Sequence, residues 1–206
     1  MNPSLDTLIR SNPLLWQGAS RLEPCSGNIN SGFAKLDAIL PDGGWPANAV
    51  IEIMTDDWSI GELQLWLPLM ARFSQQDKWL TMIAPPYVPY APALANAGIR
   101  LDRLLIIDAT VSTQDIWWSA DKTLRAQASA IVLIWLPQAD PRGIRRLQLA
   151  ASAGDTLGVL FHCQTCTGSP APLRLHLSAC EQGQGLNIKI IKARGSWQRH
   201  SIILNV

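Results

Sequence analysis

The sequence predicts a three-layer α/β/α domain with a mostly parallel central sheet and a C-terminal antiparallel extension. From Val50 to Cys163, apolar runs of strand length alternate with segments of helical period. Such alternation gives right-handed crossovers and a parallel sheet that is covered on both faces. After Cys163, short alternating strands follow one another across Gly-rich turns. Because 48% of the 206 residues are hydrophobic, the chain can bury a sizeable core.

The expected elements follow one another in regular order. A first helix is predicted over residues 31–40, where Pro41 ends it. Strands of the alternating part are predicted at 50–54, 79–84, 104–108, 130–136 and 157–163. Helices are predicted between them at 61–76, 91–97, 113–126 and 141–153. The antiparallel strands are predicted at 173–177, 186–192 and 201–205.

Residues 1–30 are predicted to form an extended arm, and residues 31–206 a single domain. Prolines punctuate the arm, which contains one apolar cluster, Leu14-Leu15-Trp16. No periodic pattern nearby would bury this cluster, so Leu15 and Trp16 are candidate partner contacts. The alternative is that Trp16 packs against its own domain.

The segment from Val50 to Leu65 has the strand–loop–helix layout of a phosphate-binding P-loop but lacks its chemistry. Glycine backbone and a lysine normally hold the phosphates, and a hydroxyl binds Mg²⁺. Here Gly61 is the only glycine of the loop, Glu62 stands at the lysine position, and Leu63 stands at the hydroxyl position. The degenerate loop comprises Thr55, Asp56, Asp57, Gly61, Glu62 and Leu63. Its carboxylates would repel a triphosphate, because like charges about 4 Å apart cost about 4 kcal/mol near a protein surface.

Two further positions also lack the acids of an ATPase. An ATPase ends its fourth strand with an Asp that holds Mg²⁺, whereas this strand ends at Trp135. Pro85 and Pro86 follow the second strand, where a catalytic Glu would lie. We therefore expect no ATP hydrolysis, no cofactor and no enzyme activity. Asp56 and Asp57 are better explained as caps of the helix after the loop.

Composition excludes several classes of function. The formal net charge of +1 is not the signature of a strongly basic nucleic-acid-binding protein. No apolar run approaches the roughly 20 residues of a membrane span, and the N-terminus lacks the pattern of a secretory signal. We therefore expect a cytoplasmic protein without membrane contact.

One cysteine motif has some of the ligands that a metal site needs. Cys163 and Cys166 form a C-x-x-C motif that, with His176 and Cys180, could supply four zinc ligands. Zinc sites usually show two close pairs with regular spacing, and this chain has one pair followed by single residues. No metal site is expected.

Aromatic and basic residues are the remaining candidates for partner contacts. Trp117 and Trp118 are adjacent on a predicted helix, so their rings point about 100° apart and one of them is expected at the surface. The basic candidates are Arg142, Arg145 and Arg146 on the next helix, and Lys189, Lys192 and Arg194 on later strands. They form either a solvated face or a contact to DNA or an acidic partner. DNA contact is expected to be indirect or weak, because the segment 163–173 is uncharged.

Several segments resemble the core of the RecA family. They are residues 31–37, the Gly-Gly-Trp-Pro turn at 43–46, residues 51–53, residues 97–105 and the late strand at 186–195. Among RecA-like proteins, the chain is most similar to the ImuA family, through residues 15–18, 43–46, 60–63, 84–87, 89–94 and 145–151. Residues 79–86 and 134–136 also suit the SulA family, but the segment 31–46 favours ImuA.

The resemblance implies a RecA-like domain with a degenerate P-loop that acts without catalysis in the SOS response. An ImuA-like protein would support translesion DNA synthesis by binding RecA and an ImuB-like relative of Y-family polymerases. Under this hypothesis, overproduction should not make undamaged cells filament. Two alternatives stay open. A SulA-like protein would inhibit cell division by binding the tubulin homologue FtsZ, and an active P-loop ATPase is disfavoured by the loop.

Overall fold

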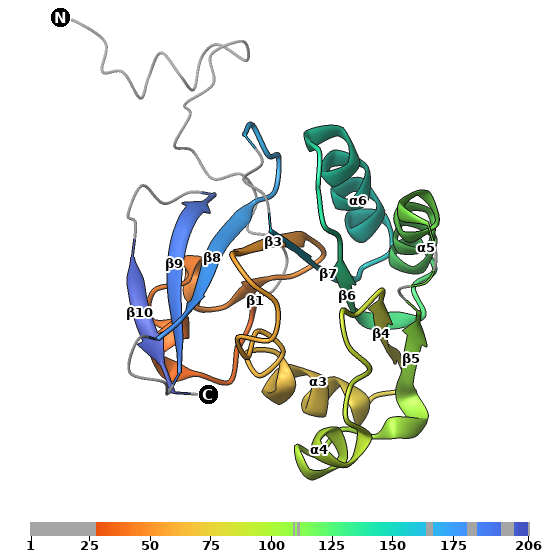
Figure 1. Ribbon diagram of the computed structural model, residues 1–206, viewed down its shortest axis with the longest axis horizontal. Helices are drawn as coiled ribbons and strands as arrows, with labels where there is room; N and C mark the ends of the chain where they lie inside the picture. Colours follow the sequence, from red (N-terminus) through yellow and green to blue (C-terminus); the bar gives the residue numbers. More distant parts are fainter. Residues whose placement is uncertain are drawn as a thin grey trace, which may run out of the picture.

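A mixed eight-stranded sheet forms the centre of the molecule (Figure 1). The computed structural model describes residues 28–108, 110, 112–163, 167–180, 185–194 and 200–205. In spatial order, the strands are β10 (Ser201–Leu204), β9 (Leu186–Ala193), β8 (Leu173–Ala179), β3 (Val50–Thr55), β7 (Leu157–His162), β6 (Ser129–Trp135), β4 (Trp79–Ile83) and β5 (Leu104–Ile107). A separate two-stranded sheet pairs β1 (Asn28–Ile29) with β2 (Trp45–Pro46).

Helices cover both sides of this sheet. They are α2 (Ala34–Asp37), α3 (Leu67–Ser74), α4 (Ala91–Asn96), α5 (Thr113–Arg125) and α6 (Pro141–Ala153), with short 3-10 turns η1 (Pro41–Gly43) and η2 (Leu101–Arg103). In the part of the chain that the structure describes, every helix is too short or too polar to traverse a bilayer.

The strand pairing confirms a mixed α/β fold with a mostly parallel sheet. β3 lies inside the sheet and pairs in parallel with β7 and β8. Parallel pairing continues from β7 through β6 and β4 to β5. Among the described strands, β9 and β10 are antiparallel to their neighbours. The predicted antiparallel extension is confirmed for the pairs β8–β9 and β9–β10, whereas β8 joins the rest of the sheet through a parallel pairing with β3.

The two faces of the sheet bury separate apolar layers. On the first face, residues such as Ile51 and Ile53 of β3 pack with α2, α3 and α4. On the second face, residues such as Val50 and Val132 pack with α5 and α6, which lie side by side (Figure 1). This division follows from the alternation of side chains along each strand. The second layer contains no residue of β8, β9 or β10 among the described residues, so the helices leave that part of the sheet open.

Two helices are shorter than the apolar pattern predicts. The helix predicted from residue 61 begins only at Leu67, and i→i+3 turns such as Gln64 N–H to the Gly61 carbonyl precede it. Pro68 explains the late start, because proline is tolerated in the first turn of a helix but not in its interior. The helix predicted over 31–40 is reduced to α2, because the Asp37 carboxylate accepts hydrogen bonds from the segment before it.

Gly154 allows the end of α6 to approach the end of α5 closely. A Cβ atom at this position would lie 1.8 Å from the carbonyl oxygen of Leu124. The Gly154 φ of −97° is accessible to any residue, so only the close approach opposes a side chain.

We therefore expect Gly154→Ala to lower the free energy of unfolding by about 1–3 kcal/mol, because backbone must move to admit one methyl group. Urea denaturation measures this change. The control is Ser152→Ala on the exposed side of the same helix, which should change stability by less than about 0.5 kcal/mol. Equal stability of the two variants would contradict the close approach.

Candidate functional site

The loop after β3 folds back on itself instead of leaving an open cradle. Thr55 Oγ1 donates a hydrogen bond to the Asp57 carbonyl oxygen at 2.7 Å. The Glu62 side chain is only 6% exposed, and its Oε1 accepts from the Ser59 N–H at 3.4 Å. Leu63 packs against the first apolar layer. Glu62 and Leu63 therefore hold the loop to the body of the protein.

Asp56 and Asp57 do not cap the following helix, so that prediction is wrong. The helix α3 begins at Leu67 and has no side-chain cap. The exposed Asp56 instead lies beside His176 of β8, with 3.4 Å between Oδ1 and Nε2. The N–H groups of a helix N-terminus, which bind phosphates in P-loop proteins, are consequently absent from this described loop.

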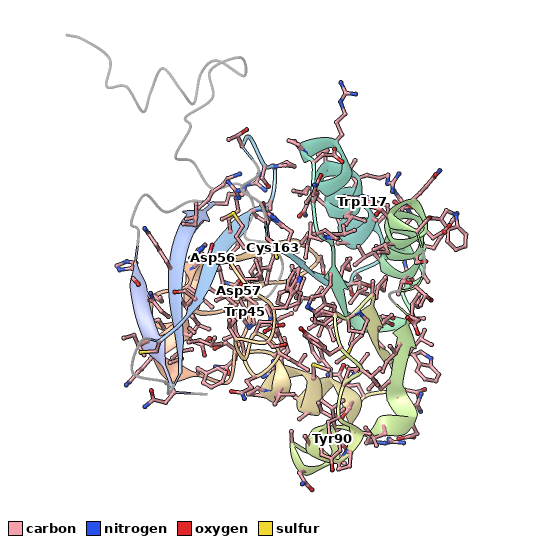
Figure 2. All side chains as sticks on the ribbon, viewed as in Figure 1. Trp45, Asp56, Asp57, Tyr90, Trp117 and Cys163 are labelled. Atoms are coloured by element: carbon pink, nitrogen blue, oxygen red, sulfur yellow. The ribbon has the colours of Figure 1, made fainter. Side chains whose placement is uncertain are left out.

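The electrostatic potential at this loop is negative. Burial raises the pKa of the Cys163 thiol, and the charges of Asp57, Asp56 and Glu62 raise it further. These carboxylates therefore act on the same region, where β3 and β7 end (Figure 2). An anion that approaches this region is repelled.

Aromatic rings fill the first apolar layer of the core. Trp45 stacks on Trp66 with 4.6 Å between ring centroids, and Trp135 stacks on Phe161 at 4.8 Å. Trp135 ends β6, at the position of the acid in an ATPase, and is only 4% exposed. The end of β6 is thus a packed apolar site.

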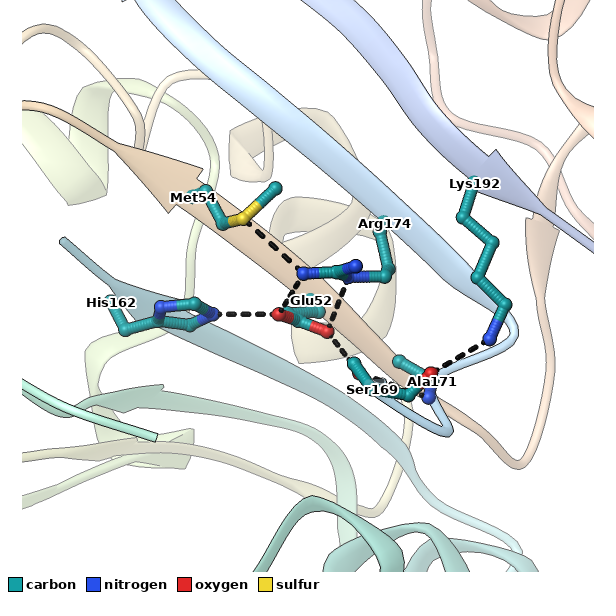
Figure 3. A network of polar contacts seen from close by, with 7 residues as sticks. All are labelled: Glu52, Met54, His162, Ser169, Ala171, Arg174 and Lys192. Carbon is teal, nitrogen blue, oxygen red and sulfur yellow. Dashed lines mark hydrogen bonds and ion pairs between the residues drawn. The ribbon is translucent and has the colours of Figure 1, made fainter. Parts of the chain in front are cut away.

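Glu52 lies at the centre of a buried polar network on the second face of the sheet (Figure 3). Its carboxylate accepts two hydrogen bonds from Arg174, from Nε at 2.9 Å and from Nη2 at 3.0 Å. His162 Nε2 lies 2.9 Å from Glu52 Oε1, and Ser169 Oγ donates to Oε2. Lys192 Nζ donates to the Ser169 carbonyl oxygen at 2.8 Å. The network therefore joins β3, β7, β8 and β9.

The network keeps Glu52 ionised. Burial alone would raise the pKa of Glu52, but hydrogen bonds from His162, Ser169 and Arg174, together with the charge of Arg174, lower it overall. A bidentate guanidinium–carboxylate pair is the strongest arrangement available for such a buried charge. We interpret the network as a structural clamp, because its carboxylate is fully buried and fully engaged.

Sequence reasoning missed this network. The one available signal was a glutamate inside the apolar run of β3, since a carboxylate seldom lies in a buried strand without a partner. The partner could not be identified, because Arg174 follows 122 residues later in the chain.

Of the two adjacent tryptophans of α5, Trp118 is the exposed one. Trp118 is 61% exposed, which confirms that one of the pair lies at the surface. Trp117 packs against the second apolar layer and over Gly143, where a Cβ atom would lie 2.5 Å from its ring. The guanidinium of Arg146 lies 6.0 Å from the centroid of the same ring.

The basic candidates form two separate groups. Arg142, Arg145 and Arg146 are exposed on α6, and Arg146 lies 3.9 Å from Asp121 of α5. Lys189, Lys192 and Arg194 are exposed on β9 or directly after it. Figure 1 shows α6 and β9 in different parts of the molecule, so these groups do not make one surface.

Other candidates lie outside the described residues. Leu15 and Trp16 belong to this part of the chain, as does Cys166 of the C-x-x-C motif. Within the described ranges, no three His, Cys, Asp or Glu side chains are grouped as metal ligands.

Comparison with known families identifies this fold. The family model described as "Cell division inhibitor SulA" matches residues 49–158, which are more than half of the 206 residues. The chain belongs to the SulA family. The match runs from the start of β3 into β7 and includes the loop after β3, α5 and α6. The strands β8, β9 and β10 lie beyond it.

Three proteins described as cell division inhibitor SulA are similar to parts of the chain. The protein of Photorhabdus laumondii is 27% identical over 101 residues, which are 49% of this chain and 56% of that protein. The protein of Serratia marcescens is 23% identical over 66% of this chain and 83% of its own length. The protein of Yersinia enterocolitica is 24% identical over 76% of this chain and 95% of its own length. A crystal structure of SulA from Pseudomonas aeruginosa covers 55% of this chain and 98% of its own, with 23% identity and a TM-score of 0.46.

Membership of the SulA family overturns the predicted ImuA-like function. The predicted role in translesion synthesis is therefore wrong, and the predicted RecA and ImuB-like partners are not supported. That prediction relied on the segment 31–46, whose Leu36, Leu40 and Trp45 are buried in the core. The apolar pattern of this segment is therefore explained by packing in the core. Packing in the core does not identify a binding partner.

The Glu52–Arg174 pair should make folding sensitive to acid. Because the folded state lowers the pKa of Glu52, the pair contributes its full stability above the ordinary carboxyl pKa of about 4.3. As the pH falls below that value, the unfolded state takes up the proton first and the contribution is lost. Glu52→Gln should cost about 3–5 kcal/mol at pH 7, because it leaves Arg174 without its counter-charge.

Urea denaturation between pH 7 and pH 3 measures both effects. Glu52→Gln/Arg174→Met should recover part of the loss, because it removes the stranded charge together with its partner. The control Asp77→Asn removes the exposed partner of Arg103 and should change stability by less than about 1 kcal/mol. Equal effects of Glu52→Gln and Asp77→Asn would contradict a buried clamp.

Proposed function

We propose that this chain inhibits cell division by binding FtsZ, as part of the SOS response and without nucleotide hydrolysis. The observation that carries the proposal is the SulA match over residues 49–158. The relatives from Photorhabdus, Serratia and Yersinia are each described as cell division inhibitors. An inhibitor of this kind needs a binding surface and no catalytic site.

We further propose that residues 31–206 form one degenerate RecA-like domain and that residues 1–30 are an arm. Three features support this ancestry. β3 lies inside the sheet and leads into a loop at the P-loop position, the strands from β3 to β5 are parallel, and two antiparallel strands close the sheet.

The surface of α5 and α6 is our candidate for the FtsZ contact. Both helices lie inside the SulA match, and they carry exposed Trp118, Arg142 and Arg145. Tryptophan and arginine are enriched among the residues that dominate binding energy at protein interfaces. An exposed indole and exposed guanidinium groups on two adjacent helices are suitable anchors for a protein partner.

Overproduction of the chain should make undamaged cells filament, which reverses the expectation from the ImuA hypothesis. In solution, the purified chain should reduce the amount of FtsZ that sediments with GTP. Trp118→Ala should weaken FtsZ binding about thirtyfold with an unchanged thermal midpoint, because the lost side chain is exposed.

The matched control is Ile203→Ala on β10, which removes a large exposed side chain beyond the SulA match. It should leave FtsZ sedimentation and filamentation unchanged. Normal cell division together with unchanged FtsZ sedimentation in the presence of the unsubstituted chain would contradict the proposal. Equal loss of binding in the two variants would contradict the assignment to α5.

We expect no saturable ATP binding at millimolar nucleotide with Mg²⁺, as measured by isothermal titration calorimetry. The motivation is the buried Glu62, the apolar Leu63 and the negative potential of the loop. Glu62→Lys should not restore binding, because Leu63 still stands at the position of the Mg²⁺-binding hydroxyl and the loop has no helix N-terminus for the phosphates. Saturable ATP binding with micromolar affinity would contradict this prediction.

A further inference from the structure

One face of β8 and β9 is open and polar. Along both strands, alternate leucine and isoleucine side chains are buried in the first apolar layer. The residues between them point to the opposite face, which neither α5 nor α6 covers. Those on β8 are Arg174, His176 and Ser178, and those on β9 are Asn187, Lys189 and Lys192.

Basic side chains stand directly opposite one another across these strands. Arg174 pairs with Lys192, and His176 pairs with Lys189. Arg174 and Lys192 are both cationic, and like charges at opposite positions of an antiparallel pair repel each other and destabilise the pairing. Arg194 follows β9 and adds to the repulsion on Lys192.

Intramolecular carboxylates neutralise only part of this charge. Glu52 engages Arg174, and Asp56 lies 3.4 Å from His176. Among the described residues, no carboxylate oxygen lies within 4.0 Å of Lys189, Lys192 or Arg194; Lys192 donates instead to a backbone carbonyl. Burial, and then repulsion by Arg174, lowers the pKa of the Lys192 ammonium. A carboxylate from outside would relieve that repulsion.

The surroundings favour a polypeptide over a nucleic acid. Proteins that bind single strands stack bases on exposed aromatic rings, and the described positions of this face carry none. Among the described residues, neither α5 nor α6 covers this face to enter a groove, and the formal net charge of the chain is only +1. Carboxylate side chains of a polypeptide can form charge-assisted hydrogen bonds with individual lysines on an open sheet surface.

We propose that the open face of β8 and β9 binds an acidic segment of a protein partner through Lys189, Lys192 and Arg194. This site is separate from the α5 and α6 surface and lies beyond the residues of the SulA match. It therefore does not depend on FtsZ as the partner of the other surface.

The test uses the full chain and a short fluorescein-labelled peptide of alternating Glu and Ser, with binding followed by fluorescence anisotropy. The chain should bind this peptide more tightly than a matched Gln–Ser peptide and an oligothymidylate. Rising salt should weaken the binding, because exposed charges are screened. Lys189→Gln/Lys192→Gln should weaken it about tenfold or more.

The charge-matched control is Lys35→Gln/Lys122→Gln, which removes two exposed lysines from α2 and α5. This control should bind the acidic peptide like the unsubstituted chain. The thermal midpoint of the Lys189→Gln/Lys192→Gln variant is measured as well, and binding is compared per folded molecule, because the substitution removes both like-charge repulsion and the hydrogen bond from Lys192 to the Ser169 carbonyl. Equal binding of the Glu–Ser and Gln–Ser peptides, equal losses in both variants, or tighter binding of oligothymidylate would each overturn the proposal.

Discussion

The ion pair between Glu52 and Arg174 fixes how the two halves of the sheet meet. Glu52 is on β3, inside the SulA match, and Arg174 is opposite it on β8, beyond the match. A slip of one residue between these strands would turn Arg174 into the first apolar layer and leave a buried carboxylate without its counter-charge. The pair therefore specifies the register. His162 and Ser169 complete the coordination of the carboxylate and extend the same constraint to β7 and to the segment before β8.

The loop after β3 follows a strand and precedes a helix, but it lacks the free helix N-terminus that binds phosphate in P-loop proteins. An anion site needs free N–H groups and a positive potential. Here Glu62 turns inward, Leu63 joins the core, and Pro68 delays the helix until the loop has passed. Each of these features packs the loop against the body of the protein instead of leaving polar groups available to an anion.

The parts of the fold that sequence could predict are those with local causes. The strands of the alternating part and the helices α5 and α6 follow from periodicity, and the exposure of one of two adjacent tryptophans follows from helix geometry. The direction of β8 and the partner of Glu52 depend on contacts across more than 100 residues, so no local pattern contained them. The choice between ImuA and SulA failed for another reason. Segment 31–46 was weighed as a functional signature, although its apolar residues serve the core.

The charge of the open sheet face follows from the same buried pair. The Glu52 carboxylate accepts two hydrogen bonds from the Arg174 guanidinium and has little capacity left for other cations. Glu52 therefore neutralises the charge of Arg174 but not the charges of the neighbouring lysines. Lys192 is held close to that guanidinium by strand pairing and by its bond to the Ser169 carbonyl. Movement of Lys192 away from Arg174 would break its hydrogen bond to the Ser169 carbonyl. Relief of the repulsion by an external carboxylate leaves that hydrogen bond intact, and for this reason the excess charge on β9 favours an acidic partner over a rearrangement of the sheet.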